Sequence, residues 1–419
     1  MDNPGRVAIL RGMALDSDIL IVGGGLNGPC LALALSQAGL TSTVIDALPV
    51  ETSDANTFDG RSYALALASA RLLMAIGVWE GVKTNAQPML DIKASDGRAG
   101  EGPSPFFLHF DHAEIEEGPM GYMLEDRFLR HALLTRMNAD PNVTHLPGAT
   151  VVAQDTGGPA SVTLEDGRML TGQVLVGADG RRSGTGARAG IKRQGWDYGQ
   201  TALVCSLRHD QPHHGIAHQF FMPPGPLAIL PLTGNRCSIV WSETHDRAAE
   251  INALSDAAYL DVLRPRFGDF LGDIALEGRR FTYPLNLTIS ERFVDTRLAL
   301  VGDAAHGVHP IAGQGLNLGL RDVGALADVL ADAKRRGENI GAIDVLERYQ
   351  QWRRFDTATL AASTDLINKL FSNDNPILRL GRDLGMGLIN AVPAARRSFI
   401  REAAGLTGDL PRLLQGKPL

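Results

Sequence analysis

The sequence predicts an α/β protein in which a nucleotide-binding domain, assembled from separate stretches of the chain, is interrupted by a β-rich insertion. Residues 18–47 form a strand, helix and strand pattern with three glycines at the first turn. Two more apolar strand patterns, within 173–184 and 297–306, also end in turns that contain glycine and aspartate. Between them, residues 196–245 consist of short strand patterns with Pro/Gly turns, which indicates a separate, mostly antiparallel sheet.

The remaining elements follow from hydrophobic periodicity and turn residues. Residues 149–176 alternate in short segments, and Asp166-Gly167 predicts a hairpin turn. Strands are expected near 273–285. Helices are expected at 62–77, 125–137, 255–266, 315–334 and 343–371.

The order of these patterns predicts how the chain is divided into domains. Gly23, Asp179 and Asp303 must meet at one ligand although they are far apart in the chain, so the nucleotide-binding domain is discontinuous. We expect an N-terminal tail (1–17), a nucleotide-binding domain (18–78, 110–190 and 297–340), a β-rich substrate domain (79–109 and 191–296) and a C-terminal helical region (341–419).

Composition excludes several classes of protein. Of 419 residues, 44% are apolar and 21% are charged, as in a folded globular protein. The net charge is −7 and no long run of Lys and Arg exists, so nucleic-acid binding is not expected. No stretch approaches the roughly 18 apolar residues of a membrane-spanning helix. Three distant cysteines indicate a reducing compartment, and we expect a cytoplasmic protein.

The first glycine-rich turn matches the pattern G-x-G-x-x-G between a strand and a helix. Such a turn lets the backbone approach a pyrophosphate at the positive end of the helix. Asp46 ends the second strand, where its carboxylate can accept hydrogen bonds from a ribose. A purely structural glycine turn is the alternative. The residues predicted to bind the cofactor here are Gly23, Gly25, Leu26, Asn27, Gly28 and Asp46.

Two further acids follow buried strands. Asp303 comes after Gly302 in VGDAAH, and Asp179 lies in VLVGADGRRS. Taken singly, Asp179 could be an ordinary turn acid and Asp303 a helix-capping acid. The order of all three turns resembles that of FAD-dependent aromatic hydroxylases of the para-hydroxybenzoate hydroxylase type, the class A flavoprotein monooxygenases. This resemblance implies that Asp303 binds FAD and that the Asp179 motif serves both FAD and the pyridine nucleotide.

A longer stretch, His309 to Asp322 (HPIAGQGLNLGLRD), is similar to the signature of the ubiquinone-biosynthesis hydroxylases. Further matches are Asp59-Gly60-Arg61, EDRFLRHAL and Tyr283-Pro284-Leu285, so the resemblance covers nearly the whole chain from Asp18. It implies a Rossmann-like FAD domain, NADPH or NADH as co-substrate, and dioxygen. It also implies transfer of oxygen from a flavin C4a-hydroperoxide to a polyprenylated phenol, and it raises a quinone-biosynthesis complex as a partner.

The loop before the helix at 315–334 is expected to hold the flavin ring. A helix that starts near Gly315 presents unpaired amides to the negative charge of reduced flavin. Pro310 would stiffen the loop, and Gln314 and Asn317 could bond the polar edge of the ring, with helix capping as the alternative for both. The loop residues predicted for catalysis or cofactor binding are Pro310, Gly313, Gln314, Gly315, Leu316 and Asn317.

Three more side chains are candidates. Arg61 and Arg127 could pair with FAD phosphates, although each could also be a surface arginine. Tyr283 is a candidate for the wall of the substrate pocket, with a plain core tyrosine as the alternative. Four histidines, His209, His213, His214 and His218, are expected to be solvated loop residues, and no metal site is predicted.

The C-terminal region is the basic part of an acidic protein. Residues 375–419 carry seven Lys or Arg and three acids, and 384–400 interleaves apolar residues with Arg396 and Arg397. We expect peripheral contact with the inner face of a membrane, with packing on the FAD domain or a subunit contact as the alternative.

The functional alternatives belong to different classes. The chain could hydroxylate a small soluble aromatic, reduce isoprenoid double bonds or halogenate a ring. It could also be a non-catalytic flavin-binding subunit of a quinone-synthesis assembly.

Overall fold

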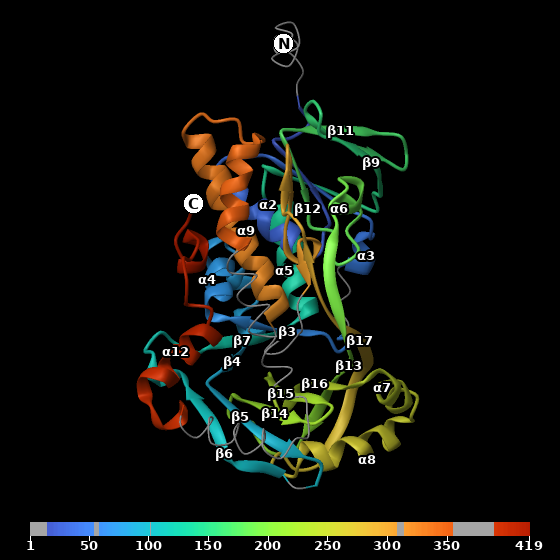
Figure 1. Cartoon of the computed structure of the whole chain (residues 1–419), viewed down its shortest axis with the longest axis vertical. Helices are drawn as coiled ribbons and strands as arrows, with labels where there is room; N and C mark the ends of the chain where they lie inside the picture. The colour runs from blue at the N-terminus through green and yellow to red at the C-terminus, as the bar shows by residue number, and fades with distance from the viewer. Residues whose placement is uncertain (1–14, 54–57, 101, 308–313, 355–388) are drawn as a thin grey trace, which may run out of the picture.

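The computed structural model describes residues 15–53, 58–100, 102–307, 314–354 and 389–419. A six-stranded sheet with its helices forms one part and an eight-stranded sheet forms the other. A three-stranded sheet lies between them (Figure 1). The expected α/β fold is confirmed.

The six-stranded sheet is parallel except for one edge strand. Its order is β18-β19-β12-β1-β2-β8, and only β18 runs antiparallel to its neighbour. β1 and β12 are buried along their whole length, as expected of parallel strands that are covered on both faces. The strands are β1 (Ile19–Val22), β2 (Ser42–Asp46), β8 (Val143–Pro147), β12 (Val174–Gly177), β18 (Val294–Asp295) and β19 (Leu298–Leu300).

Helices cover one face of this sheet, and a small antiparallel sheet lies on the other side (Figure 1). The small sheet has the order β11-β10-β9, and its β10–β11 hairpin turns at Gly167, which confirms the predicted turn. Further short helices are α3 (Val50–Ser53) and α6 (Gly184–Arg188). The packed helices and small strands are α2 (Asn27–Gln37), α5 (Asp126–Asn138), α9 (Gln314–Arg335), β9 (Val151–Asp155), β10 (Ala160–Leu164) and β11 (Met169–Gly172).

The eight-stranded sheet has the order β20-β17-β13-β16-β15-β14-β5-β6. Its two longest strands, β13 and β17, each span 17 residues and run from one part of the molecule to the other (Figure 1). α7 (His245–Asn252) and α8 (Asp256–Phe267) cover its outer face. The strands are β5 (Asp91–Arg98), β6 (Gly102–Asp111), β13 (Arg193–His209), β14 (Ile216–Met222), β15 (Gly225–Leu232), β16 (Arg236–Thr244), β17 (Ile274–Ser290) and β20 (His306–Gly307).

The three-stranded sheet, of order β3-β7-β4, joins the two parts. Glu125 at the end of β7 accepts a hydrogen bond from Arg236 of β16 at 2.7 Å, and its side chain is 2% exposed. This buried pair therefore connects the central sheet to the eight-stranded one. The strands are β3 (Ser62–Ala66), β4 (Gln87–Met89) and β7 (Gly121–Glu125).

The helix predicted at 62–77 is wrong in its first part. Residues 62–66 form β3, which pairs antiparallel with β7, and α4 begins only at Leu67 and ends at Ala75. The alanine-rich run favours a helix by local propensity, but pairing with a strand some 60 residues away determines its structure. Such a partner leaves no signal in the local pattern.

The strand predicted at 297–306 is also shorter than expected. It ends at Leu300, and residues Gly302–Ala304 form a 3-10 turn in which Gly302 has φ +60°. The helices predicted at 125–137, 255–266 and 315–334 are confirmed. The one predicted at 343–371 is present over 343–354, and its remainder lies outside the described residues.

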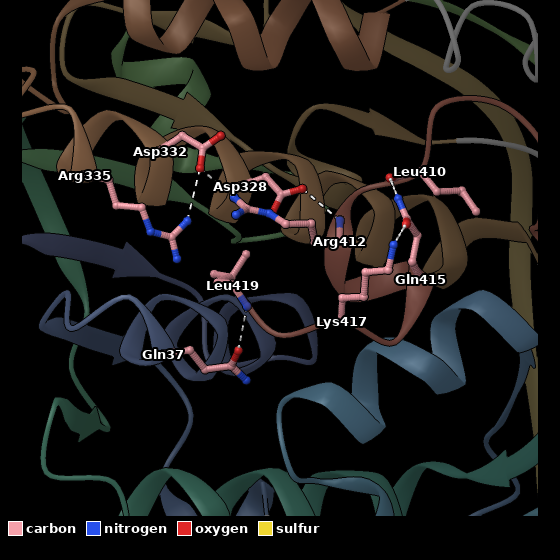
Figure 2. Close-up of polar contacts among 9 residues, drawn as sticks. All are labelled: Gln37, Asp328, Asp332, Arg335, Leu410, Arg412, Gln415, Lys417 and Leu419. Carbon is pink, nitrogen blue, oxygen red and sulfur yellow. Dashed lines mark hydrogen bonds and ion pairs between the residues drawn. The ribbon is translucent and has the colours of Figure 1, made fainter.

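The last residues of the chain pack against α9, one of the helices that cover the six-stranded sheet. Arg412 donates to Asp328 of α9 from its backbone amide at 2.9 Å and from Nε at 2.8 Å, and its Nη2 donates to Asp332 at 2.8 Å (Figure 2). Leu414 is 1% exposed and packs so closely against Gly324 of α9 that a side chain at residue 324 would collide with it. Residues 404–419 therefore pack against α9, whereas the expected membrane contact of residues 384–400 stays a prediction.

Leu414→Ala should lower the free energy of unfolding by about 2–5 kcal/mol, because it leaves a cavity against α9. Lys417→Ala is the matched control, since this exposed lysine bonds Gln415 at the surface and its loss should cost under about 0.5 kcal/mol. Urea unfolding of both variants measures the difference. Equal, small effects would contradict the packing of this segment.

Candidate active site

The carboxyl ends of four parallel strands gather the predicted site residues at one edge of the six-stranded sheet. The Gly23 amide donates to Ile45 O at 2.8 Å, the Ala178 amide to Val22 O at 2.8 Å, and the Val301 amide to Gly177 O at 3.0 Å. The turns after β1, β2, β12 and β19 are therefore adjacent. Ligands of open parallel sheets bind at this edge.

Glycine occupies several positions of the first turn, for different physical reasons. Gly23 has φ +116°, and a Cβ there would lie 2.4 Å from Ala178 O. A Cβ on Gly24 would meet the Asp46 carboxylate at 2.3 Å, and one on Gly28 would meet Gly23 O at 2.0 Å. A Cβ on Gly25 would meet no atom within 4 Å, so the turn is open at this residue.

The N-terminus of α2 behind this turn suits an anion. Leu26 occupies the N-cap position and makes no side-chain cap hydrogen bond, and the first turn contains no acidic residue. The first amides of the helix, with the partial positive charge of its end, therefore face the open side of the turn at Gly25. Asp46, 8% exposed, accepts a bond from the Leu48 amide at 3.1 Å and holds its position at the end of β2.

Asn27 joins the first turn to the Gly302 turn. A Cβ on Gly302 would lie 2.1 Å from Asn27 Nδ2, and one on Gly319 of α9 would lie 2.5 Å from the same atom. Its Oδ1 is buried without a hydrogen-bond partner among the described residues. The side chain thus fills the space between two glycines, and a polar atom remains for a further donor.

Asp303 lies beside the turn of the Asp179 motif. Arg181 Nε donates to Asp303 Oδ2 at 3.1 Å, and Arg193 Nη2 donates to the Asp303 carbonyl at 3.0 Å. The Asp303 side chain is 38% exposed, so its carboxylate is held in place but still accessible. The turns of Gly23, Asp179 and Asp303 thus lie side by side, and their common contact with one ligand stays a prediction.

The Asp179 carboxylate is used within its own loop. It accepts a bond from the Ser183 hydroxyl, and the Thr185 amide and hydroxyl each donate to its Oδ2 at 2.9 Å. Ser183 in turn caps α6, so the glycines at 184 and 186 do not prevent a helix there. The turn-acid alternative describes this carboxylate, and a direct role of Asp179 in cofactor binding stays a prediction.

The start of α9 is fixed by Asn317, whose side chain is 6% exposed. Its Oδ1 accepts bonds from the Ala66 amide at 2.8 Å and the Ser69 hydroxyl at 2.7 Å, and its Nδ2 donates to Ala64 O at 2.8 Å. These bonds use three of the four positions of the amide, so Asn317 mainly anchors α9 to β3 and α4. Contact of its amide with a flavin ring stays a prediction.

Gly315 and Leu316 lie in the first turn of α9. Among the described residues, no atom lies within 4 Å of the place of a Cβ on Gly315, and Leu316 is partly buried. Pro310, Gly313 and the Gln314 side chain lie outside the described residues, and their roles stay predictions.

Arg61 and Arg127 are paired with acids rather than solvated. Arg61 Nε bonds Asp59 at 2.7 Å and its Nη2 lies 3.3 Å from Asp126, whereas Arg127 Nε bonds Glu125 at 2.8 Å. Arg61 is still 39% exposed and Arg127 25% exposed, so the surface-arginine alternative is not contradicted for either. Contact with FAD phosphates stays a prediction.

Tyr283 is 42% exposed on β17, so the alternative of a core tyrosine is wrong. Its ring stacks on Phe281 with centroids 6.4 Å apart. Partial burial raises the pKa of its hydroxyl, and the nearby charge of Arg61 opposes this rise. Tyr283 therefore lies where the loop of Asp59 and Arg61 approaches the eight-stranded sheet.

The expectation of solvated loop histidines is wrong for two of the four. His209 lies in β13, is 5% exposed and bonds Gln211 O through Nδ1 at 2.8 Å. His218 lies in β14 against Phe270, and burial lowers its pKa to about 4. Within the described ranges, no group of three His, Cys, Asp or Glu could hold a metal ion.

Taken together, the uncapped helix end, the open turn at Gly25 and the two acids fit a dinucleotide such as FAD. Sequence reasoning missed Arg181 and Arg193, which hold Asp303. Arg181 stands next to the Asp179 motif and could have been found there, whereas Arg193 lies 110 residues from Asp303 and leaves no local signal.

Gly25→Ala should leave the apo-protein folded and lower its affinity for FAD at least tenfold, because the new methyl group points into the open side of the turn. Gly28→Ala is the contrasting variant, since its methyl group collides with Gly23 O and should destabilise the apo-protein itself. Thermal unfolding of apo-protein and titration with FAD separate the two effects. Unchanged FAD affinity in Gly25→Ala would remove this turn from the cofactor site.

Residues 16–361 match the FAD binding domain family. The chain is 46% identical over 408 residues to the ubiquinone hydroxylase UbiL of Rhodospirillum rubrum, covering 96% of this chain and 94% of that protein. It is 34% identical over 393 residues to the 3-demethoxyubiquinol 3-hydroxylase of Escherichia coli (strain K12), covering 93% and 99%.

Among solved structures, p-nitrophenol 4-monooxygenase PnpA from Pseudomonas putida DLL-E4 has the same fold, with a TM-score of 0.78 at 20% identity over 94% of this chain and 99% of that one. The glycine turn, the acids at the strand ends and the relatives that match nearly the whole chain all agree. The chain therefore belongs to the ubiquinone-biosynthesis family of FAD-dependent hydroxylases and is a FAD-dependent monooxygenase.

Proposed function

We propose that this enzyme adds a hydroxyl group to the ring of a polyprenylated phenol on the route to ubiquinone, with NADPH or NADH as reductant. One dioxygen, one reduced nicotinamide and one proton are consumed, and one oxygen atom enters the ring while the other leaves as water. The observation that carries the proposal is an accessible apolar row on the inner face of the eight-stranded sheet, in a chain whose named relatives are ubiquinone hydroxylases.

The row follows from strand register. Residues directly opposite each other on neighbouring strands share one face of a sheet. One line of such pairs crosses five strands, and every member is only partly buried although all five strands are interior. Its members are the apolar residues Phe281 (β17), Val204 (β13), Val240 (β16) and Ala228 (β15), and the polar Gln219 (β14) ends it.

The opposite face of the same strands is closed. Leu203, Cys205 and Ile239 are 1%, 0% and 0% exposed, because α7 and α8 pack over them. On the inner face, this row is partly exposed, whereas its neighbours Ala202 and Ser238 on the same face are 1% and 2% exposed. Small and branched apolar side chains there leave room for a ring and an apolar tail.

Tyr283 stands on the same face as this row, two residues along β17 from Phe281. The positive charge of Arg61 acts on its hydroxyl, and the Arg61 guanidinium is paired with Asp59 and Asp126. A polar group at the end of an apolar surface suits the hydroxyl of a phenol. We assign Tyr283 to the orientation of the substrate ring.

FAD, when bound, supplies the reduction of dioxygen and the transfer of one oxygen atom. The chain positions this chemistry: the first turn of α9 offers amides to developing negative charge, and Asn317 fixes that turn.

The reduced nicotinamide would dock through its phosphates at a basic cavity of about 230 Å³. Arg181, Arg182 and Arg193 line it together with Ser183 and Ser290, and it lies next to the carboxylate of the cofactor turn. Guanidinium groups pair with phosphate oxygens in two-bond geometry, which favours a phosphate ligand.

Contact with a membrane and membership of a quinone-biosynthesis complex stay predictions. No helix within the described residues is long and apolar enough to cross a membrane. In α12 (Pro393–Ala403), Arg396 pairs with Glu114 at 2.7 Å and Arg401 with Glu117 at 3.1 Å, so two of its three arginines are neutralised. Phe399 remains 46% exposed beside them.

The purified FAD-loaded enzyme should oxidise NAD(P)H in the presence of a prenylated phenol and form hydroxylated product in equal amount. Val240→Phe should raise KM for this substrate several-fold, because the larger ring fills the inner row, while FAD content stays unchanged. Mass spectrometry of the product and oxygen uptake measure both. Turnover only of short soluble phenols would support the soluble-aromatic alternative, and no turnover at all would support the flavin-binding subunit.

Arg182→Glu should raise KM for the reduced nicotinamide at least tenfold, because it places a negative charge in the phosphate cavity. Arg397→Glu on exposed α12 makes the same change of charge away from this cavity and is the control. Rapid-mixing measurements of FAD reduction at several NADPH and NADH concentrations give the values. Equal behaviour of the two variants would exclude the cavity.

A further inference from the structure

Three ionisable side chains form a fully buried cluster beneath the Gly302 turn. Asp322 of α9 is 0% exposed, and His306 of β20 and Arg353 of the helix at 343–354 are each 1% exposed in their side chains. Burying charges is costly unless they are paired and hydrogen-bonded. A cluster of this kind in the core therefore calls for a physical reason.

The Asp322 carboxylate connects three separate segments to α9. Its Oδ2 accepts a bond from the Gly302 backbone amide at 2.8 Å and from His306 Nε2 at 2.6 Å. Its Oδ1 accepts a bond from Arg353 Nε at 2.8 Å. One side chain thus fixes the turn before Asp303, the strand after it and the helix behind.

The surrounding groups favour an ionised Asp322. Burial alone would raise the pKa of this carboxyl, but the charges of His306 and Arg353 and their hydrogen bonds outweigh it and hold the pKa below its ordinary value. Tyr349, also buried, faces the cluster and donates its hydroxyl to Leu300 O at 2.7 Å. The carboxylate therefore keeps full acceptor strength for the Gly302 amide.

The Gly302 turn is held from two opposite sides. Asn27 fills the space where a Gly302 Cβ would lie, and the positive φ of Gly302 matches this contact. Asp322 holds the amide of the same residue from the side of α9. Residue 303 follows directly, so the location of its carboxylate relative to the N-terminal turn of α9 depends on both contacts.

His306 extends this control to the next segment. Its backbone pairs with Ile289 of β17, while its side chain bonds Asp322. β17 also carries Phe281 and Tyr283 of the inner face. The cluster therefore connects α9 to the eight-stranded sheet as well as to the turn of Asp303.

We propose that Asp322, oriented by His306 and Arg353, is a positioning residue that fixes the Gly302 turn and with it the location of the Asp303 carboxylate, and so determines how FAD is held. An ion cluster with only a packing role would stabilise the fold and leave the bound flavin unchanged. Buried ion pairs can often be replaced by apolar groups at little cost to stability, so packing alone does not explain why the carboxylate also bonds the backbone next to a cofactor acid.

The test compares two carboxylates of the same helix. Asp322→Asn replaces an acceptor by an amide whose NH2 must face one of three donors, so the Gly302 turn should shift. The FAD dissociation constant should then rise at least tenfold, and the visible absorption and circular dichroism of bound FAD should change. Asp328→Asn, which loosens only the Arg412 contact, should lower the melting temperature and leave both flavin measurements unchanged.

A second variant covers the case in which Asp322→Asn does not fold. His306→Leu removes one hydrogen-bond donor to Asp322 and places an apolar side chain next to Phe293. It should shift the flavin spectrum in the same direction with a smaller loss of FAD affinity. Wild-type affinity and spectrum in a folded Asp322→Asn or His306→Leu protein, or equal flavin changes in Asp328→Asn, would overturn the proposal.

Discussion

Parallel pairing of β1 with β2 and β12, and of β12 with β19, is the constraint on which the rest of the molecule depends. It brings four strand ends to one edge although the chain between them is long. Each strand end carries a residue type suited to that edge: glycine where backbones touch and acid where a ribose or ribityl hydroxyl would bind. The β-rich insertion is tolerated because β13 and β17 leave and re-enter the FAD-side part as one long paired ribbon.

Features with a local cause could be predicted from the sequence. The turn at Gly23, the acid at Asp46 and the hairpin at Gly167 each depend on residues within a few positions of one another, and all three lie where expected. Strand β3 could not be predicted, because its conformation is decided by β7. The direction of the Asn317 side chain could not be predicted either, since its partners lie about 250 residues away.

Charge patterns along the chain predicted less than charge pairs in space. The basic C-terminal region suggested a surface that attracts anions, yet Arg396, Arg401 and Arg412 each face an acid from another element. Arg61 is held by acids in the same way. A linear count of charge does not include these partners, because folding decides which acids come near. Only the three-dimensional structure shows whether an arginine pairs with an acid and orients a loop or is available to bind a ligand.

The fold itself does not choose the substrate, because the same architecture is found in a p-nitrophenol 4-monooxygenase at 20% identity. The choice must lie in side chains that can vary without moving the strand ends. The inner row meets this condition: Val204, Val240 and Ala228 are partly exposed, and their neighbours on the closed face hold the sheet together. Their size can change the shape of the pocket while Asp46 and Asp303 stay in place. Under the proposed function, substrate choice and cofactor binding would be carried by different sheets, and β17 and the Arg236–Glu125 pair join these sheets.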